Sequence, residues 1–179
     1  NNRVVDLDSG KTVTQPINTN GNYSMGFWGG MGFKIKKINT RVYIGPGFRY
    51  NQATDVFNSV LNYSKTLGAD LSLNISKEKE KKYEFGIGNN VSYNNNKTTQ
   101  NNTSSNYLTN TLSLSAKVFI LKSLSVHSDY EFYTQQKTEQ LNTGLSFQLW
   151  NARLEKTFKK DEFTAYITVR DILNQNVGI

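Results

Sequence analysis

Apolar and polar side chains alternate along most of this chain. From Tyr23 to Ile35 the odd-numbered positions are mostly large and apolar, whereas the even-numbered positions are mostly Gly, Ser or Lys. Trp28 and Gly29 depart from this alternation. Successive side chains of a β-strand point to opposite faces, so a period of two predicts a strand with one apolar and one polar face.

The alternation returns in further stretches and predicts about eight antiparallel strands between Asn22 and Asp171. Several of them run about 12 to 16 residues, whereas strands of soluble sheets centre on about 5 to 6 and a tilted membrane strand needs about 9 to 11. The predicted strands occupy residues 23–35, 41–50, 63–75, 83–93, 108–120, 124–132, 141–158 and 163–169.

A few positions depart from the pattern. Pro46 lacks an amide donor, so its strand must contain a bulge or lose a ladder bond. The apolar residues change from odd to even numbers at Leu149 and Trp150, which predicts a β-bulge or a strand start there. Asn89 and Lys65 fall on the apolar face, and Lys65 is expected near the outer edge of that face, where its ammonium can reach water.

The connectors alternate in length along the chain. Residues 36–39, 76–82, 122–123 and 159–162 are short or compact, whereas 52–60 and 94–105 are long and 135–140 is intermediate. Outer-membrane barrels have short periplasmic turns and longer extracellular loops, so the two sets are expected at opposite ends. Residues 1–21 contain a predicted hairpin tip at 8–11 and are expected to belong to an extracellular loop, or else to be a short N-terminal arm.

Composition favours a membrane sheet over a soluble domain. Only 36% of the residues are hydrophobic, 12% are aromatic, and the mean hydropathy is −0.58, which leaves a soluble core poorly supplied. A transmembrane barrel needs apolar residues on one face only, with aromatic residues at the two interfaces. No apolar run is long enough for a membrane helix. The predicted fold is therefore all-β, a transmembrane antiparallel β-barrel.

Charge and cysteine content exclude several classes of site. The net charge is +7, but the lysines gather at turns with acids between them, as in residues 77–82, so no nucleic-acid partner is predicted. Without cysteine the chain has no disulfide, Cys metal ligand or Cys nucleophile. The sequence begins without Met or a recognisable signal peptide, so its start is expected to be processed or internal to a longer protein.

Several stretches resemble the outer-membrane β-barrel family related to TonB-dependent receptors. They are residues 75–85, 150–152, 156–161 and 169–176. Within the last of these, Asp171-Ile172-Leu173-Asn174 is similar to the Asn-Leu-Phe-Asn-like segment near the end of many such barrels. The resemblance covers essentially the whole chain, as the late part of such a barrel.

The resemblance implies a barrel of roughly twenty-two strands around a plug domain, driven by an inner-membrane energy transducer and importing a scarce nutrient. The chain contains no plug, no transducer-binding box and no final strand ending in an aromatic residue. Residues 22–179 are therefore expected to be an incomplete transmembrane β-barrel segment whose C-terminal strands are missing.

The charged residues of the polar face are the candidates for contact with a plug or a solute. His127 is interpreted as a polar interior residue rather than a metal ligand. Asp129 and Glu131 could lie within the carboxylate spacing of a retaining glycosidase, but no pocket or nucleophile pattern supports catalysis. No enzyme activity, catalytic residue, metal or cofactor is predicted, and Gly86-Ile87-Gly88 is not a phosphate loop because no helix follows it. The candidates are Arg41, Arg49, Asp70, Glu84, Lys117, His127, Asp129, Glu131, Arg153 and Arg170.

Three functions remain open at this point. The first is a TonB-dependent-receptor-like protein of the cell outer membrane, which binds a solute at the surface and passes it through a plugged barrel. The second is a structural or partner-binding barrel without transport, in an envelope assembly or with a surface lipoprotein, and a closed eight-strand barrel is one form it could take. The third is a soluble polar β-sandwich adhesin. For the first two, outer-membrane lipid is an expected partner.

Overall fold

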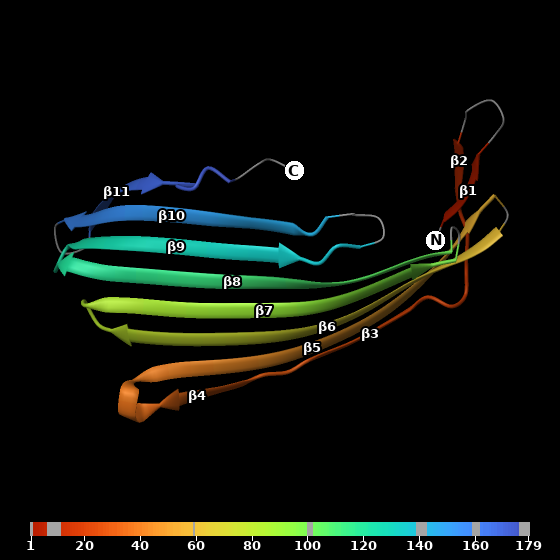
Figure 1. Ribbon diagram of the computed structural model, residues 1–179. Helices are drawn as coiled ribbons and strands as arrows, with labels where there is room; N and C mark the ends of the chain where they lie inside the picture. The colour runs from red at the N-terminus through yellow and green to blue at the C-terminus, as the bar shows by residue number, and fades with distance from the viewer. Residues whose placement is uncertain are drawn as a thin grey trace.

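The computed structural model describes residues 2–6, 12–58, 60–99, 102–138, 143–158 and 162–175. Within these ranges the chain forms one sheet of eleven strands, and the only helical turn described is a short 3₁₀ turn, η1 (Lys36–Ile38) (Figure 1). The strands are β1 (Asn2–Asp6), β2 (Thr12–Pro16), β3 (Tyr23–Trp28), β4 (Met31–Ile35), β5 (Thr40–Phe57), β6 (Val60–Lys79), β7 (Tyr83–Thr98), β8 (Thr103–Leu121), β9 (Leu124–Gln135), β10 (Leu145–Phe158) and β11 (Phe163–Val169).

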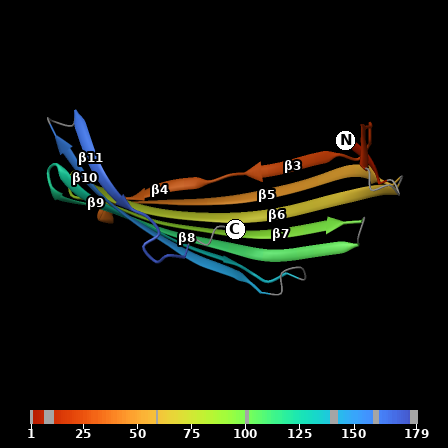
Figure 2. The same cartoon turned by 90° about the horizontal axis from the view of Figure 1, so that it is seen from above.

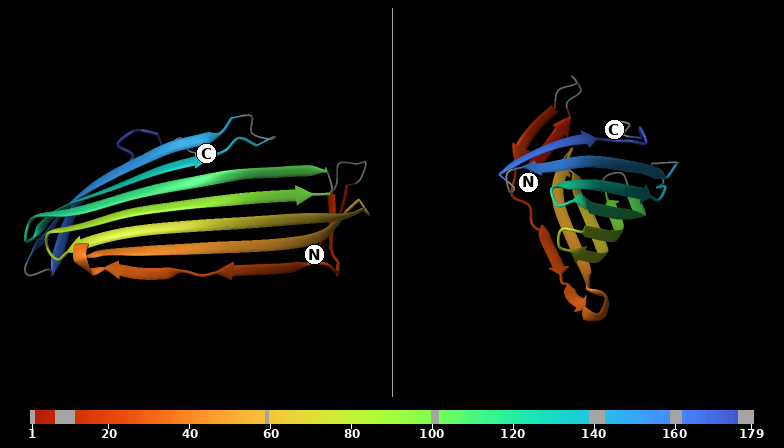
Figure 3. Two further views of the ribbon diagram at one scale, coloured as in Figure 1. Left: turned by 60° about the horizontal axis from the view of Figure 1, so that its bottom comes forward. Right: turned by 90° about the vertical axis from the view of Figure 1, so that its left-hand side faces the viewer.

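The sheet is a simple antiparallel meander. From β5 to β11 each strand pairs with the next along the chain, and β3 and β4 lie on one line along the other edge of β5. Together these elements match the prediction of about eight antiparallel strands, with β3 and β4 counted as one. The sheet is curved, and among the described residues no ladder joins β11 to β2, β3 or β4, so it is open (Figures 2 and 3).

Pro46 explains why one predicted strand becomes two. The N–H of Gly29 donates to the carbonyl of Pro46 at 3.2 Å, but Pro46 has no N–H to return the bond. The ladder therefore breaks between Trp28 and Met31, although the register is the same on both sides of the break. The pairing of β5 with β6 continues through Pro46, because antiparallel pairs alternate between bonded and non-bonded sites. The predicted loss of a ladder bond is confirmed.

The registers of the long ladders define two faces. The apolar face contains the in-register row Val42, Ile75, Ile87, Leu114, Tyr130 and Trp150. It also contains every second residue of each strand, counted in both directions from this row. The polar face contains the adjacent row Arg41, Ser76, Gly86, Ser115, Asp129 and Asn151. The one register shift in these ladders lies in the β8–β9 pair, between Phe119 and Leu121.

The prediction of a β-bulge or a strand start at Leu149 and Trp150 is wrong. The β9–β10 register runs without a shift from Leu145 opposite Gln135 to Lys156 opposite Leu124. Leu145, Phe147 and Leu149 therefore lie on the polar face, where Phe147 stacks on Tyr133 with ring centroids 4.9 Å apart. Stacking of this kind provides apolar contact within the polar face, so the strand continues without a bulge.

The predicted long loops are largely strand. We call the end of the sheet at η1 and residues 80–82 the turn end, and the opposite end the distal end. At the distal end β5 continues to Phe57 and β6 begins at Val60, while β7 and β8 extend to Thr98 and from Thr103. The Asn- and Thr-rich segment 94–105 is thus mostly paired backbone, with Asn95 opposite Asn106. Ladder pairing satisfies the backbone groups there, so polar side chains do not prevent strand formation.

The N-terminal segment lies at the distal end. β1 and β2 pair in antiparallel register, and β1 makes a short parallel contact with the end of β5 at Val56 and Phe57. Residues 7–11, which contain the predicted hairpin tip, lie outside the described residues. Figure 1 shows this pair projecting away from the main sheet.

The sheet has no apolar core within the described residues. The buried side chains there are Thr40, Thr54, Asn62 and Ser125, and none of them is hydrophobic. The accessible surface is 13023 Å², whereas a compact soluble protein of 20.3 kDa exposes about 8,800 Å². Both faces of the sheet therefore lack the cover that a folded single sheet needs.

The structure confirms the coarse prediction of an all-β, mainly antiparallel fold. Closure into a barrel and a total of twenty-two strands stay predictions. No helix in the described part of the chain is long and apolar enough to cross a membrane.

Candidate functional site

The polar face gathers the charged residues that the sequence singled out. Nine of the ten candidates lie on strands and point to this face, by the registers of β5 to β10. Arg170 follows the last residue of β11. The prediction that these side chains share one face therefore agrees with the observed registers, whereas their contact with a plug or solute stays a prediction.

Charges cross the sheet near the turn end in a single in-register row. Glu78 lies opposite Glu84, Glu84 opposite Lys117, Lys117 opposite His127 and His127 opposite Arg153. The row changes sign between β7 and β8, with carboxylates on one side and cationic or ionisable nitrogen groups on the other. Opposite charges across a ladder stabilise a sheet by about 0.2–1 kcal/mol per pair.

Glu155 joins two cations of this region. Its Oε1 lies 3.5 Å from Lys117 Nζ and its Oε2 lies 2.9 Å from Arg153 Nη2. The Arg153 guanidinium also lies 3.9 Å from the centroid of the Tyr166 ring on β11, a cation–π contact. His127 Nε2 lies 3.3 Å from Asp129 Oδ1 on the same strand. The charges of β8 to β11 are thus largely neutralised within the sheet.

A second polar network lies nearer the middle of the sheet. Arg49 Nη1 donates to Asp70 Oδ2 at 2.9 Å, and its Nη2 donates to Asn94 Oδ1 at 2.6 Å. The Ser92 hydroxyl donates to Asp70 Oδ1 at 2.6 Å. Both carboxylate oxygens of Asp70 are therefore occupied, and the network ties β5, β6 and β7 together. At the turn end Arg41 makes a separate, exposed ion pair with Glu78.

Two aromatic rings lie against glycines on this face. A Cβ added at Gly26 would stand 2.2 Å from the Trp28 indole, and one added at Gly30 would stand 2.2 Å from the Tyr43 hydroxyl. Only glycine leaves room for rings in these positions. Between the rings is a hollow of about 240 Å³, also lined by Asp70, Ser72 and Asn90.

The distal part of the polar face carries a larger and chemically different groove. It has a volume of about 480 Å³ and is lined mainly by hydroxyl and amide groups, among them Thr66, Asn96, Ser105, Tyr107 and Gln135, and Lys65 and Lys97 also belong to its lining. The polar face therefore changes from paired charges near the turn end to mainly hydroxyl and amide groups near the distal end. A neutral polar solute could form hydrogen bonds in this groove without displacing an ion pair.

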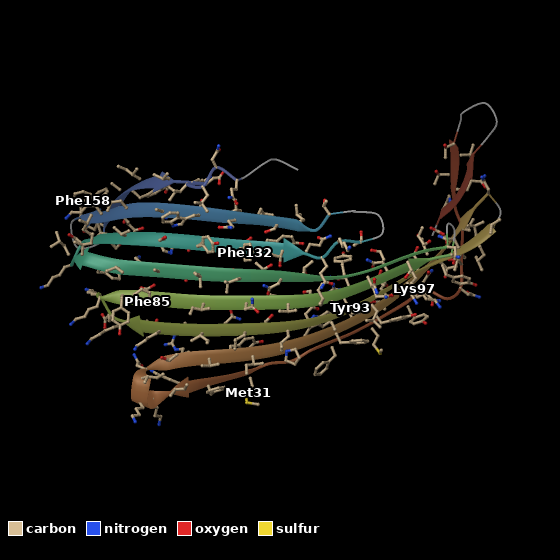
Figure 4. The ribbon with its side chains drawn as sticks, in the orientation of Figure 1. Met31, Phe85, Tyr93, Lys97, Phe132 and Phe158 are labelled. Atoms are coloured by element: carbon tan, nitrogen blue, oxygen red, sulfur yellow. The ribbon has the colours of Figure 1, made fainter. Side chains whose placement is uncertain are left out.

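The apolar face has the opposite character. In the strands from β3 to β11 it carries no carboxylate, and its charged side chains are Lys65, Lys77, Lys79, Lys97 and Lys156. Figure 4 shows Phe85 and Phe158 of this face near the turn end and Lys97 near the distal end, with Met31 and Phe132 between them. Large apolar side chains thus occupy the stretch between the lysines.

The Asn89 exception has a local explanation. Its Nδ2 donates to Asn110 Oδ1 at 2.7 Å, and Asn110 shares the apolar face on the neighbouring strand. A hydrogen-bonded amide pair loses less free energy on leaving water than two separate amides do.

Several partners in these networks do not follow from the sequence alone. Glu78 was predicted to lie in a turn, and Glu155, Asn110 and Trp28 were not among the predicted site residues. Whether each residue has an odd or even number on its strand indicates the face on which it lies. Its partners depend on the register between strands, which one sequence does not determine. Among the described residues no ion pair uses Glu84, Glu131 or Arg170, and no group of three or more His, Asp or Glu side chains could hold a metal ion.

Comparison with protein-family models, curated proteins and solved structures gives no match to this chain. The resemblance to TonB-dependent receptors therefore stays a prediction that rests on the sequence stretches named above.

Proposed function

We propose that this chain forms part of the wall of an outer-membrane β-barrel, with its apolar face toward lipid and its polar face toward the interior. The turn end would lie in the periplasm and the distal end, with its long hairpins, outside the cell. The described residues supply the two features that such a wall needs, an apolar face and a continuous ladder that satisfies the backbone.

The spacing of two lysines on β6 carries this proposal. Between Lys65 and Lys77 the apolar face of β6 reads Leu67, Ala69, Leu71, Leu73 and Ile75. The lysines are separated by roughly 41 Å along the strand, which a tilt of about 45° reduces to roughly 29 Å. That length matches the hydrocarbon core of a bilayer, about 30 Å thick. The apolar face of this strand thus has a charge at each proposed membrane surface and none between.

The lack of a core supports the same conclusion. A soluble β-sandwich buries alternate residues of each strand against a second sheet. Here Leu71, Ile87 and Leu114 are all exposed, although they lie well inside long ladders. Lipid contact gives these side chains an apolar environment, so the soluble adhesin is the weaker interpretation.

Solute uptake is the transport function proposed for this wall. The groove at the distal end of the polar face, with its many hydroxyl and amide groups, is a suitable place for first contact with a solute. In the TonB-dependent mode, a plug domain and an inner-membrane energy transducer would drive passage of that solute through the barrel.

A structural or partner-binding barrel in an envelope assembly is the second candidate. The observation that favours it is that Arg49, Asp70, Lys117 and Arg153 already form ion pairs within the sheet. Such charges stabilise the wall and leave few groups free for a solute.

Consecutive single-cysteine variants test the orientation. Because the chain has no cysteine, Leu71→Cys, Ser72→Cys and Leu73→Cys can each carry one nitroxide in the full-length protein reconstituted in lipid vesicles. Positions 71 and 73 should be relaxed more by oxygen, and position 72 more by a water-soluble nickel chelate. A smooth trend without alternation, or a monomeric protein that needs no detergent, would contradict the proposal. Solute uptake with and without the energy transducer then separates transport from a structural role.

A further inference from the structure

We propose that Lys65 and Lys97 bind the phosphate group of an anionic lipid at the distal limit of the apolar face. This inference rests on the membrane orientation proposed above and names a lipid class for one position on that face. The observation behind it is that the two faces of the sheet carry different charged side chains.

Every carboxylate on strands β3 to β11 points to the polar face, whereas the apolar face carries lysines alone. Lys117 and Arg153 on the polar face have acidic partners. Among the described residues, no ion pair uses Lys65 or Lys97, and both side chains are exposed. The apolar face thus presents positive charge without an internal counter-charge.

The two lysines lie directly opposite each other in the β6–β7 ladder. Like charges in directly opposed positions destabilise a pair of strands. An anion between the two ammonium groups turns this repulsion into two attractive contacts. A phosphate suits the position because its oxygens accept several charge-assisted hydrogen bonds at once.

The neighbouring side chains complete the site. The in-register row across four strands is Gln52, Lys65, Lys97 and Ser104. The Gln52 amide donates to the Gly21 carbonyl at 2.9 Å, and the two ammoniums and the Ser104 hydroxyl supply further donors for an anion. One pair further along β5, toward the turn end, Tyr50 stacks on Tyr23 with ring centroids 5.5 Å apart. Tyrosines of this kind occupy the interface between hydrocarbon and headgroups.

A lipid fits this position better than free phosphate. Leu67 is the next residue of the apolar face on β6 toward the turn end, and the apolar row continues from it. A headgroup held by the lysines therefore has its acyl chains beside that row. A free anion would gain the ionic contacts but not the apolar ones.

The experiment measures local lipid enrichment around the full-length protein. Bimane is attached at Asn95→Cys, beside Lys97, and separately at Phe85→Cys near the turn end, in vesicles of phosphatidylcholine with phosphatidic acid. A nitroxide at acyl position 5 is carried either by phosphatidic acid or by phosphatidylcholine, and the ratio of the two quenching efficiencies reports preference for the phosphate headgroup. Each lysine near an anionic surface favours binding roughly fivefold. The ratio at position 95 should therefore exceed one and fall close to one in Lys65→Gln/Lys97→Gln.

The controls separate this site from general attraction. Lys77→Gln/Lys79→Gln removes the same charge from the turn end and should leave the ratio at position 95 unchanged. The Lys65→Gln/Lys97→Gln protein should in turn keep its ratio at position 85. In the protein with native lysines, sodium chloride at about 1 M should lower the ratio at position 95, because the Debye length falls to about 3 Å. Because the salt measurement uses the protein with its native lysines, it remains informative if a lysine variant fails to fold.

Three results would overturn the proposal. A ratio near one at position 95 with Lys65 and Lys97 intact excludes a preference for phosphatidic acid. An unchanged ratio in a folded Lys65→Gln/Lys97→Gln protein excludes these lysines. Loss of the preference with inorganic phosphate, but not with sodium chloride at matched ionic strength, identifies a free anion as the ligand. If neither lipid quenches either label, the apolar face does not contact lipid and the proposed function itself is wrong.

Discussion

Arg49 donates to Asp70 across the β5–β6 ladder at 2.9 Å, and its side chain lies directly over Gly68, its in-register partner on β6. A Cβ at position 68 would stand 2.6 Å from the guanidinium carbon and 2.9 Å from Cγ of Arg49. The glycine therefore allows the arginine to lie flat and reach both Asp70 and Asn94.

Gly68→Ala should displace Arg49 and lower the free energy of unfolding by about 1–3 kcal/mol. Urea titration in lipid vesicles measures the change. Gly32→Ala is the matched control, because its Cβ would meet nothing closer than 3.8 Å and the substitution is expected to be neutral or slightly stabilising. Equal losses in the two variants would show that the Arg49 contact is not the cause.

The two tryptophans should report opposite environments. Trp28 lies on the polar face, opposite Gly47, whereas Trp150 lies on the apolar face, opposite Tyr130. In Trp28→Phe, the remaining Trp150 should be quenched strongly by lipids with brominated acyl chains. In Trp150→Phe, the remaining Trp28 should respond mainly to aqueous acrylamide. Similar quenching of both tryptophans by brominated lipid would contradict the assignment of the faces.

Asn89 and Asn110 should depend on each other. Asn89→Leu leaves the Asn110 amide without its 2.7 Å partner on the apolar face, which should cost about 1–3 kcal/mol. The double variant Asn89→Leu/Asn110→Leu removes both polar groups and should recover most of that loss. A double-mutant cycle on unfolding free energies measures the coupling. Additive effects would mean that the pair does not act as a unit.

Pro46→Val should close the gap between β3 and β4 in the ladder that these two strands form with β5. The new N–H at position 46 can donate to the Gly29 carbonyl, which completes the pair that Gly29 already begins. Hydrogen exchange should slow at residues 28–31 and 44–47, with little change in the β6–β7 ladder. Unchanged exchange at both segments would show that another feature, such as the Gly29–Gly30 pair, interrupts the strand.

Strand faces could be predicted from the sequence, whereas strand lengths could not. On β6 and β7 an apolar residue at almost every second position fixes which side chains share a face, and the structure has the same phase. The segment 94–105 has no such contrast, so its strand character depends on pairing between Asn95 and Asn106 and their neighbours. At Leu149 the apolar residues suggested a change of face, but the backbone register continued and Phe147 found an aromatic neighbour instead.

For the candidate site, the sequence predicted which face of the sheet each side chain lies on, but not which side chains contact one another. Arg153 and Lys117 were placed on the polar face because of their positions on alternating strands. That both contact Glu155 depends on how β8, β9 and β10 align, and this alignment depends on the turns that connect them. Likewise, the glycines beneath Trp28 and Tyr43 are visible in the sequence, but the rings that cover them follow only from the three-dimensional arrangement.

In the proposed membrane orientation, the pair of lysines at either end of the apolar row on β6 would also determine how deep the strand sits in the bilayer. Moving the strand by two residues along its axis, in either direction, would carry Lys65 or Lys77 toward the hydrocarbon. A lysine at the bilayer midplane costs about 2–4 kcal/mol and one near the interface about 0–1 kcal/mol, so each shift increases the energy. The sheet would therefore hold a narrow range of vertical positions, and a membrane a few ångströms thinner or thicker would adjust to the protein rather than the reverse.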